Sequence, residues 1–230
     1  HDSFRVGEDG PTHQPIEHET QIRLLEGLKR EDGKSEMLVL RPADAFETVT
    51  AWEMAFENND RPTAIILTRQ NVKTLPGDAR YETSRACRKG AYIVSDNSGS
   101  ARPDLTFVSN GSDVLLTHDA AEILRGEGLK VRVVSMISPA LFMAQDRETR
   151  DSIIVPWTPV FAKSSGLPLL FAQVVGGFGK VSGLERFGAS APAGVLEKEF
   201  GYTPEAVAAA AKEYLAEFKK NVEDFRKFNE

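Results

Sequence analysis

The chain has 230 residues, of which 41% are hydrophobic and 27% are charged, so it is long enough for one large domain or two modest ones with a packed core. Its mean hydropathy of −0.30 excludes general disorder, and no apolar run approaches the roughly 18 residues that cross a bilayer. Because the formal net charge is −6 and extended nucleic acid needs a basic face, we expect neither a nucleic-acid nor a membrane partner.

Cysteine usage favours a reducing compartment. Cys87 is the single cysteine of the chain and cannot close an intramolecular disulfide, so we expect a cytoplasmic protein rather than a disulfide-stabilised secreted domain. The first residue, His1, begins a dense polar segment rather than a helix or a strand. We therefore expect the chain to be part of a longer protein.

The first part of the chain predicts a strand–helix–strand unit after an initial helix. The expected elements are a helix over 14–28, a charged loop over 29–36, a strand at 37–40, an amphipathic helix over 45–57 with Asp44 as its N-cap, and a strand at 63–68. Strand–helix–strand units with short loops favour parallel pairing. Arg69 and Gln70 would then follow the carboxyl end of a strand, which is the edge where open α/β sheets bind ligands.

A second unit is expected after a linker over 71–89. Its predicted elements are strands at 91–95, 105–108, 130–135, 153–155, 159–162 and 169–175, and helices over 112–127 and 204–228. The alternation of strands and helices predicts an α/β fold with two units in tandem, each built as three layers around a parallel or mixed sheet.

The segment from His1 to Pro15 carries the strongest local signal for a ligand site. It combines two histidines, several carboxylates and two glycines directly before a predicted helix. Polar side chains and helix N–H groups could converge there on one small ligand.

Within this segment, His13 and Asp9 are the candidate functional residues. His13 would lie beside the positive end of the helix dipole, which favours the neutral imidazole that accepts a proton, and Glu17 could fix its tautomer. The alternative for His13 is a helix cap or a hydrogen-bonded core residue, but the surrounding motif favours the functional role. Asp9 could accept a hydrogen bond from a substrate hydroxyl, or it could serve only in an Asp-Gly turn.

Arg69 is a natural ligand for a phosphate group. Its guanidinium can form charge-assisted hydrogen bonds with phosphate oxygens, and His1 could share the same anion. The alternative role for Arg69 is a salt bridge at the end of the strand. We expect no metal site, because His13 and His18 do not form a complete ligand set. The run 176–180 lacks the hydroxyl residue and the upstream spacing of a phosphate-binding loop.

Four stretches of the sequence resemble the transketolase family. The stretch 1–17, which contains Gly7-Glu8-Asp9-Gly10-Pro11-Thr12-His13-Gln14-Pro15, resembles the signature of the transketolase pyrimidine-binding domain, and three later stretches agree in order: 41–44, 67–70 and 187–192. The resemblance implies a partial pyrimidine-binding domain of the thiamine diphosphate fold over 1–88. It also implies a transketolase C-terminal domain over 89–230.

By this resemblance, the parent enzyme transfers a two-carbon ketol group between sugar phosphates of the pentose phosphate pathway, using thiamine diphosphate with Mg²⁺ or Ca²⁺. His13 resembles the family's catalytic histidine, which binds substrate and assists proton transfer, and Asp9 resembles the carboxylate that contacts a substrate hydroxyl. His1 and Arg69 resemble ligands of the sugar phosphate. Such groups move protons and orient the sugar while the cofactor carries the carbanion chemistry.

The same resemblance implies that the chain is a fragment. The family's diphosphate and metal site lies in an N-terminal domain, and the glutamate that activates the cofactor lies upstream of His1. The main cofactor-binding residues are therefore expected outside this chain. Family active sites form between the two subunits of a homodimer, so we expect the isolated chain to be inactive in ketol transfer.

The sequence departs from the family pattern at three places, and two alternatives stay open. Phe4-Arg5 replaces the common Ile-Gly, 29–36 resembles an insertion, and 161–184 lacks an aromatic Phe-Gly-Trp pattern. The first alternative is a related enzyme such as dihydroxyacetone synthase or deoxyxylulose phosphate synthase. The second is a noncatalytic dimerisation or regulatory module. Retention of the whole polar set favours the enzyme.

Overall fold

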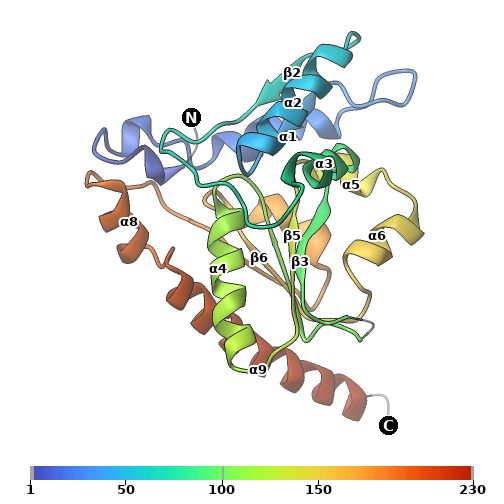
Figure 1. Ribbon diagram of the computed structural model, residues 1–230, viewed down its shortest axis with the longest axis vertical. Helices are drawn as coiled ribbons and strands as arrows, with labels where there is room; N and C mark the ends of the chain where they lie inside the picture. The colour runs from blue at the N-terminus through green and yellow to red at the C-terminus, as the bar shows by residue number, and fades with distance from the viewer. Residues whose placement is uncertain (1–2, 100, 229–230) are drawn as a thin grey trace.

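The computed structural model describes residues 3–99 and 101–228, which form two α/β units in tandem (Figure 1). The first unit holds a two-stranded sheet and the second holds a five-stranded sheet. The α/β class and the tandem arrangement predicted from the sequence are confirmed. Among the described residues, none of the helices combines the length and the apolar character needed to cross a bilayer.

The sheet of the first unit pairs β1 (Leu38–Leu40) with β2 (Thr63–Ile65) in parallel, as the strand–helix–strand order predicts. The two strands are connected by α2 (Ala45–Glu57). Asp44 caps this helix, because its Oδ1 accepts a hydrogen bond from the Glu47 amide at 2.9 Å.

The first helix, α1 (His18–Gly27), begins later than the predicted start at residue 14. Gln14 precedes Pro15 and takes extended backbone, with φ −103° and ψ 100°, because proline disfavours the helical region for the residue before it. The preceding residues instead form a separate 3₁₀ turn, η2 (Pro11–His13).

Five strands form a mixed sheet in the second unit, in the order β3-β5-β4-β6-β7. β3 is antiparallel to β5, and all other neighbours are parallel. The strands are β3 (Tyr92–Asp96), β4 (Leu105–Ser109), β5 (Val131–Ser135), β6 (Val160–Lys163) and β7 (Lys180–Ser182).

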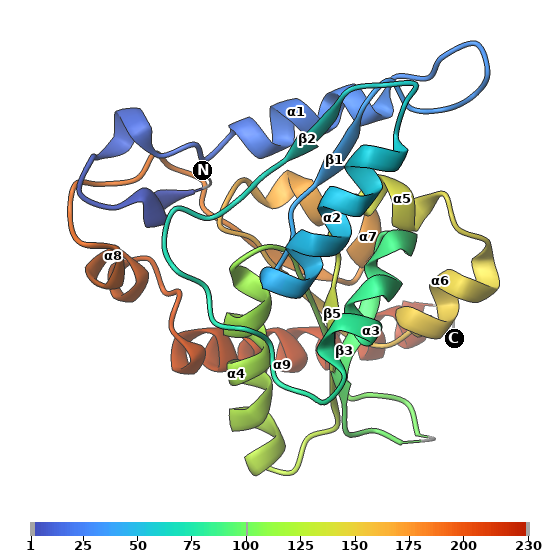
Figure 2. The same ribbon diagram turned by 45° about the horizontal axis from the view of Figure 1, so that its top comes forward.

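Helices cover both faces of this sheet, which gives the unit three layers (Figures 1 and 2). Phe107 packs toward α4 (Asp113–Gly126) and α9 (Pro204–Phe228), whereas its neighbour Val108 faces the opposite core, because successive side chains of a strand point to opposite faces. The elements that contribute to the opposite core are α5 (Pro139–Met143), α6 (Arg147–Ile153), η4 (Pro168–Phe171) and α7 (Ala172–Val175).

Three expectations about individual elements are wrong. The predicted linker over 71–89 contains α3 (Arg80–Ser84) and η3 (Arg85–Lys89). The expected strand at 153–155 includes the end of α6, and the expected strand at 169–175 is η4 followed by α7. Short apolar runs are typical of both strands and buried helical turns, so periodicity alone does not separate them. The same reasoning predicts neither β7 nor α8 (Ala193–Glu199).

The two units share a hydrophobic core. Leu38, Leu40 and Met54 of the first unit belong to the same buried cluster as Tyr92 and Ile137 of the second. This packing fixes the first sheet against the second unit. The predicted boundary between residues 88 and 89 stays a prediction.

Candidate functional site

The polar N-terminal loop, which we define as residues 3–15, is a series of tight turns. The Gly7 amide donates to the Phe4 carbonyl, the Gly10 amide to the Gly7 carbonyl and the His13 amide to the Gly10 carbonyl, at 3.0, 3.1 and 3.0 Å. Gly7 and Gly10 have φ angles of 87° and 82°, a backbone region that glycine reaches without strain. Glycine at these two positions therefore lets the chain turn repeatedly within a few residues.

The segment 187–192 packs on this loop. Gln14 Nε2 donates to the carbonyl oxygens of Gly7 and Ala189, at 2.7 and 2.9 Å. A Cβ on Gly10 would lie 2.4 Å from the Ser190 hydroxyl, so a larger residue there would have to displace the Ser190 side chain. The two sequence stretches thus support each other in space, and Figure 2 shows the adjoining helix α8 beside the N-terminal loop.

The structure brings Asp9 and Arg69 together. Asp9 Oδ2 lies 3.9 Å from Arg69 Nε, and each side chain is about half exposed. The segment that carries Arg69 is tied to the loop, because Gln70 Nε2 donates to the Arg5 carbonyl at 3.1 Å. A partly exposed guanidinium keeps further N–H donors for an anion.

His13 lies in an open groove of about 440 Å³, whose lining also includes Glu17, His18 and Phe187. Its Nδ1 lies 3.1 Å from the Thr12 hydroxyl. Glu17 Oε1 contacts His18 Nδ1 at 3.3 Å, so the expectation that Glu17 fixes the tautomer of His13 is not supported. The reason is that His13 belongs to η2, outside α1, and the two residues do not share one helix.

The other predicted site residues are Asp9, Arg69 and His1. Asp9 and Arg69 are not among the described residues that line the His13 groove, so their pairing and the groove are two separate features of the same loop region. His1, the predicted second phosphate ligand, lies outside the described residues.

A buried cluster of charges lies beneath the N-terminal loop. Arg5 and Arg41 both contact Asp113, the first residue of α4, at 2.9 and 3.3 Å. Burial alone would raise the pKa of Asp113, but the two guanidinium groups lower it below its usual range. The carboxylate is therefore held in its charged form.

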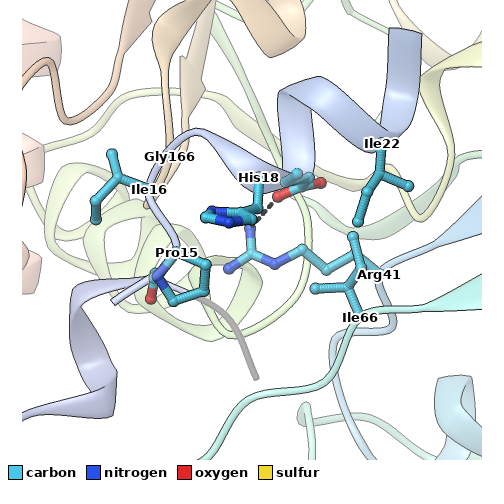
Figure 3. A pocket seen from close by; sticks show the side chains of 9 residues that line it. Pro15, Ile16, His18, Ile22, Arg41, Ile66 and Gly166 are labelled. Atoms are coloured by element: carbon cyan, nitrogen blue, oxygen red, sulfur yellow. Dashed lines mark ion pairs between the residues drawn. The ribbon is translucent and has the colours of Figure 1, made fainter. Parts of the chain in front are cut away.

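Arg41 also extends this cluster toward α1. Its Nη1 lies 3.4 Å from Glu19 Oε2, and Figure 3 shows its guanidinium directed toward His18 and Pro15 in a pocket of about 60 Å³. A space of this size suits ordered water rather than a substrate. We interpret Arg41 as part of the support beneath the loop.

Sequence reasoning did not assign roles to these supporting residues. Arg5 stood out only as a departure from the family pattern, and Asp113 was not singled out. One signal was available, because Asn110 and Asp113 follow the carboxyl end of β4, and the same rule had identified Arg69.

The described residues do not fit a metal-bound diphosphate. Within 3–99 and 101–228, no three His, Cys, Asp or Glu side chains are placed to hold one ion, and a diphosphate cofactor in proteins commonly needs a cation to neutralise its charge. We therefore derive no step of chemistry through a cofactor held by these residues.

Comparison with known families identifies both units. Residues 1–74 match the family described as "Transketolase, pyrimidine binding domain". Residues 90–203 match the family described as "Transketolase-like TK C-terminal domain". The two matches follow each other along the chain in the order of the two structural units.

Individual relatives match nearly the whole chain. A chloroplastic transketolase of Craterostigma plantagineum is 43% identical over 218 residues, which cover 94% of this chain and 39% of that protein. A transketolase of Halalkalibacterium halodurans is 42% identical over 94% of this chain and 31% of its own length. A transketolase structure from Pichia stipitis, in complex with sedoheptulose-7-phosphate, superimposes with a TM-score of 0.81 at 34% identity and covers 96% of this chain and 30% of that one. The chain thus spans less than two fifths of the length of each relative.

Proposed function

The chain belongs to the transketolase family, and we propose that it is the C-terminal portion of an enzyme that transfers a two-carbon ketol group between sugar phosphates. The observation that carries this proposal is the contact between Asp9 and Arg69. These residues come from two stretches that resemble the family, and they meet on the loop that also bears His13. The sedoheptulose-7-phosphate complex of the Pichia stipitis relative supports sugar phosphates as the substrate class.

Each residue of the proposed site has a chemical role. Arg69 binds the phosphate through its free N–H donors, and His1 shares this anion. Asp9 accepts a hydrogen bond from a sugar hydroxyl. The Thr12 hydroxyl contacts His13 Nδ1, so we assign Nε2 as the atom that binds the substrate and moves a proton to or from its oxygen.

The proposed cofactor is thiamine diphosphate with Mg²⁺ or Ca²⁺, held by a part of the enzyme outside the described residues. When bound, this cofactor supplies the centre that stabilises a carbanion. The residues of this chain bind and orient the sugar and handle protons at its oxygens.

The first unit supports the need for a complementary part of the enzyme. Among the residues that the structure describes, its parallel sheet consists of two strands, whereas parallel sheets are normally larger and covered on both faces. Several apolar side chains on or next to its two main helices are exposed: Leu24 and Leu25 on α1, Leu28 directly after it, and Val49, Trp52 and Phe56 on α2. We infer that the isolated chain is inactive and that the working enzyme is a homodimer of complete transketolase units in the cytoplasm.

A reconstitution assay tests this function. The purified chain would be assayed alone and together with a separately expressed N-terminal portion of transketolase, with thiamine diphosphate, Mg²⁺, a ketose phosphate donor and ribose 5-phosphate. We expect background rates from the chain alone and measurable ketol transfer from the mixture. Replacing His13 with Ala should lower the rate by about 100-fold or more, whereas replacing His118, which lies on α4, should leave it unchanged.

Five results would each contradict the proposal or part of it. Turnover by the chain alone would reject its inactivity, and an unchanged rate in His13→Ala would reject the proton-transfer role. A mixture that forms a stable complex without any ketol transfer would favour the noncatalytic module. Faster transfer to formaldehyde than to ribose 5-phosphate would favour a dihydroxyacetone synthase instead, and condensation of pyruvate with glyceraldehyde 3-phosphate would favour a deoxyxylulose phosphate synthase.

A further inference from the structure

Arg5 connects the N-terminal loop to the second unit through its side chain. This residue is 5% exposed. Its Nε donates to Glu197 Oε1 at 2.8 Å, and its Nη1 donates to Asp113 Oδ1 at 2.9 Å and to the Ser165 hydroxyl at 2.5 Å. The three acceptors belong to α8, to α4 and to the segment after β6, so one guanidinium contacts three separate parts of the second unit.

Two aromatic rings pack against the guanidinium of Arg5. Its central carbon lies 5.0 Å from the centroid of the Phe4 ring and 5.4 Å from that of Tyr202. Phe4 itself packs against Phe200 and Tyr202, with ring centroids 5.3 and 4.7 Å apart. The beginning of the loop is therefore fixed by packing as well as by charge.

The backbone of Arg5 is connected by hydrogen bonds both to the segment that carries Arg69 and to the loop that carries His13. Its carbonyl accepts the hydrogen bond from Gln70, the neighbour of Arg69. Its 3₁₀ turn, η1 (Phe4–Val6), begins the series of hydrogen bonds that runs through Gly7 and Gly10 to His13. A shift of this turn would thus be transmitted both to Arg69 and to His13.

We propose that Arg5 is a positioning residue through which the C-terminal domain holds the substrate loop and the Arg69 segment in one geometry. The expected effect of Arg5 on substrate binding rests on the proposed function. The claim that Arg5 anchors the loop does not depend on that function. The anchor gives the C-terminal domain a role in the site, although no residue of that domain is assigned to bind the substrate.

The variant Arg5→Leu is suited to a test because the fold keeps compensating contacts. Asp113 would still be paired with Arg41, and Glu197 is 38% exposed, so water can hydrate it. The matched control is Arg132→Leu. Arg132 is also buried and pairs with Asp96 at 2.8 Å. It lies on β5, and its other hydrogen bonds go to the carbonyl oxygens of Ser152 and Ile153, away from the loop.

Hydrogen exchange on the complete purified chain tests whether Arg5 anchors the N-terminal loop. In Arg5→Leu, we expect the amides of Gly7, Gly10 and His13 to exchange about tenfold faster or more, because their turns lose the anchor. The amides of Phe107 and Val133 in the central strands should be less affected. In Arg132→Leu, the loop amides should keep the exchange rates of the parent chain. Unchanged loop exchange in Arg5→Leu would overturn the proposal.

Kinetics of the reconstituted enzyme test whether this anchoring affects substrate binding. We expect Arg5→Leu to raise the KM for ribose 5-phosphate by about tenfold, Arg5→Lys to recover part of this loss, and Arg132→Leu to leave KM unchanged. An unchanged KM in Arg5→Leu would overturn the positioning role even if the loop exchanges faster. If no mixture turns over, the proposed function fails, and the exchange experiment alone decides whether Arg5 anchors the loop.

Discussion

Asp9 and Arg69, which belong to two distant stretches of the chain, lie with their charged groups 3.9 Å apart at the surface of the first unit. An exposed ion pair of this kind contributes little to folding, because water and salt screen it. Its side chains are 50% and 45% exposed and reachable by a solute. The pair therefore adds little to the free energy of folding and stays accessible to a solute, as the proposed role in substrate binding requires.

Replacing Arg69 with Ala should weaken binding of ribose 5-phosphate and of inorganic phosphate by about tenfold or more, since each charge-assisted hydrogen bond contributes roughly 1.5–3 kcal/mol. Arg69→Lys should recover only part of the affinity, because an ammonium lacks the planar fork. Isothermal titration calorimetry on the isolated chain measures these affinities without any need for turnover.

The variant Asp9→Asn is the matched control for this prediction. It should weaken binding of ribose 5-phosphate, because the sugar hydroxyl loses a charged acceptor, yet it should not weaken binding of inorganic phosphate. Equal losses for both ligands in Asp9→Asn, or full phosphate affinity in Arg69→Ala, would show that the two residues do not divide the substrate in this way.

The local pattern of the sequence indicates the candidate site residues, but it does not indicate the buried residues that support them. Asp9, His13 and Arg69 stand in polar motifs next to glycines or at a strand end, so their positions along the chain already suggest chemistry. The contact between Arg5 and Asp113 joins residues 108 positions apart, and nothing in the local sequence of either residue indicates the other. Such pairs follow from tertiary packing, which a single sequence does not specify.

The fold shows the same division. The helix 45–57 was predicted at its observed bounds because Asp44 is a strong N-cap and the apolar positions repeat at helical spacing. The run 169–175 was wrongly expected to be a strand. Leu169 is 64% exposed whereas Phe171 is fully buried, and a short apolar run carries no sign of which side chain will face the core.

Replacing Gly10 with Ala should destabilise the protein and disorder the site together. The residue has φ 82° and ψ −175°, a region that costs a residue with a Cβ about 1–3 kcal/mol. The new Cβ would also lie 2.4 Å from the Ser190 hydroxyl. We expect a loss of about 2 kcal/mol or more in the free energy of unfolding, measured by urea denaturation, together with weaker binding of ribose 5-phosphate.

The control for this prediction is Gly194→Ala in α8. Gly194 has no atom within 4 Å of the position of an added Cβ, and a helical Ala is favoured over Gly by about 0.5–1 kcal/mol. This variant should be as stable as the parent chain or slightly more stable. Equal stability of Gly10→Ala and Gly194→Ala would mean that the loop can turn without the left-handed backbone at Gly10.

Lys163 is a buried cation with an incomplete set of partners. It is 3% exposed, its Nζ lies 3.1 Å from the Ser182 hydroxyl, and it lies 3.5 Å from the centroid of the Tyr202 ring. Burial lowers the pKa of Lys163, the nearby Asp113 carboxylate partly opposes this, and the Arg5 guanidinium adds to it, so that the pKa falls to about 8. The folded state therefore disfavours the charged form relative to the unfolded chain.

The sign of the resulting pH dependence follows from proton binding. Between pH 8 and about 10.4, the unfolded chain holds a proton on Lys163 that the folded chain has released, so this group makes stability rise with pH through that window. Below pH 8 the cost of the buried cation is fully present. It is on the order of 3 kcal/mol at 1.36 kcal/mol for each unit of pKa.

Replacing Lys163 with Met should accordingly raise the free energy of unfolding at pH 7 by about 1–3 kcal/mol, less than the full cost because the contacts with Ser182 and Tyr202 are lost. The gain should shrink as the pH rises toward 10, and urea denaturation of variant and parent at each pH measures it. Tyrosines titrate in both proteins, so the difference between the two curves isolates Lys163.

Lys180→Met serves as the control, because Lys180 is 45% exposed and pairs with Glu217 at 3.3 Å, and it should change stability little. A Lys163→Met variant that is less stable than the parent at pH 7, with the same pH slope, would mean that the buried ammonium is well solvated by its partners.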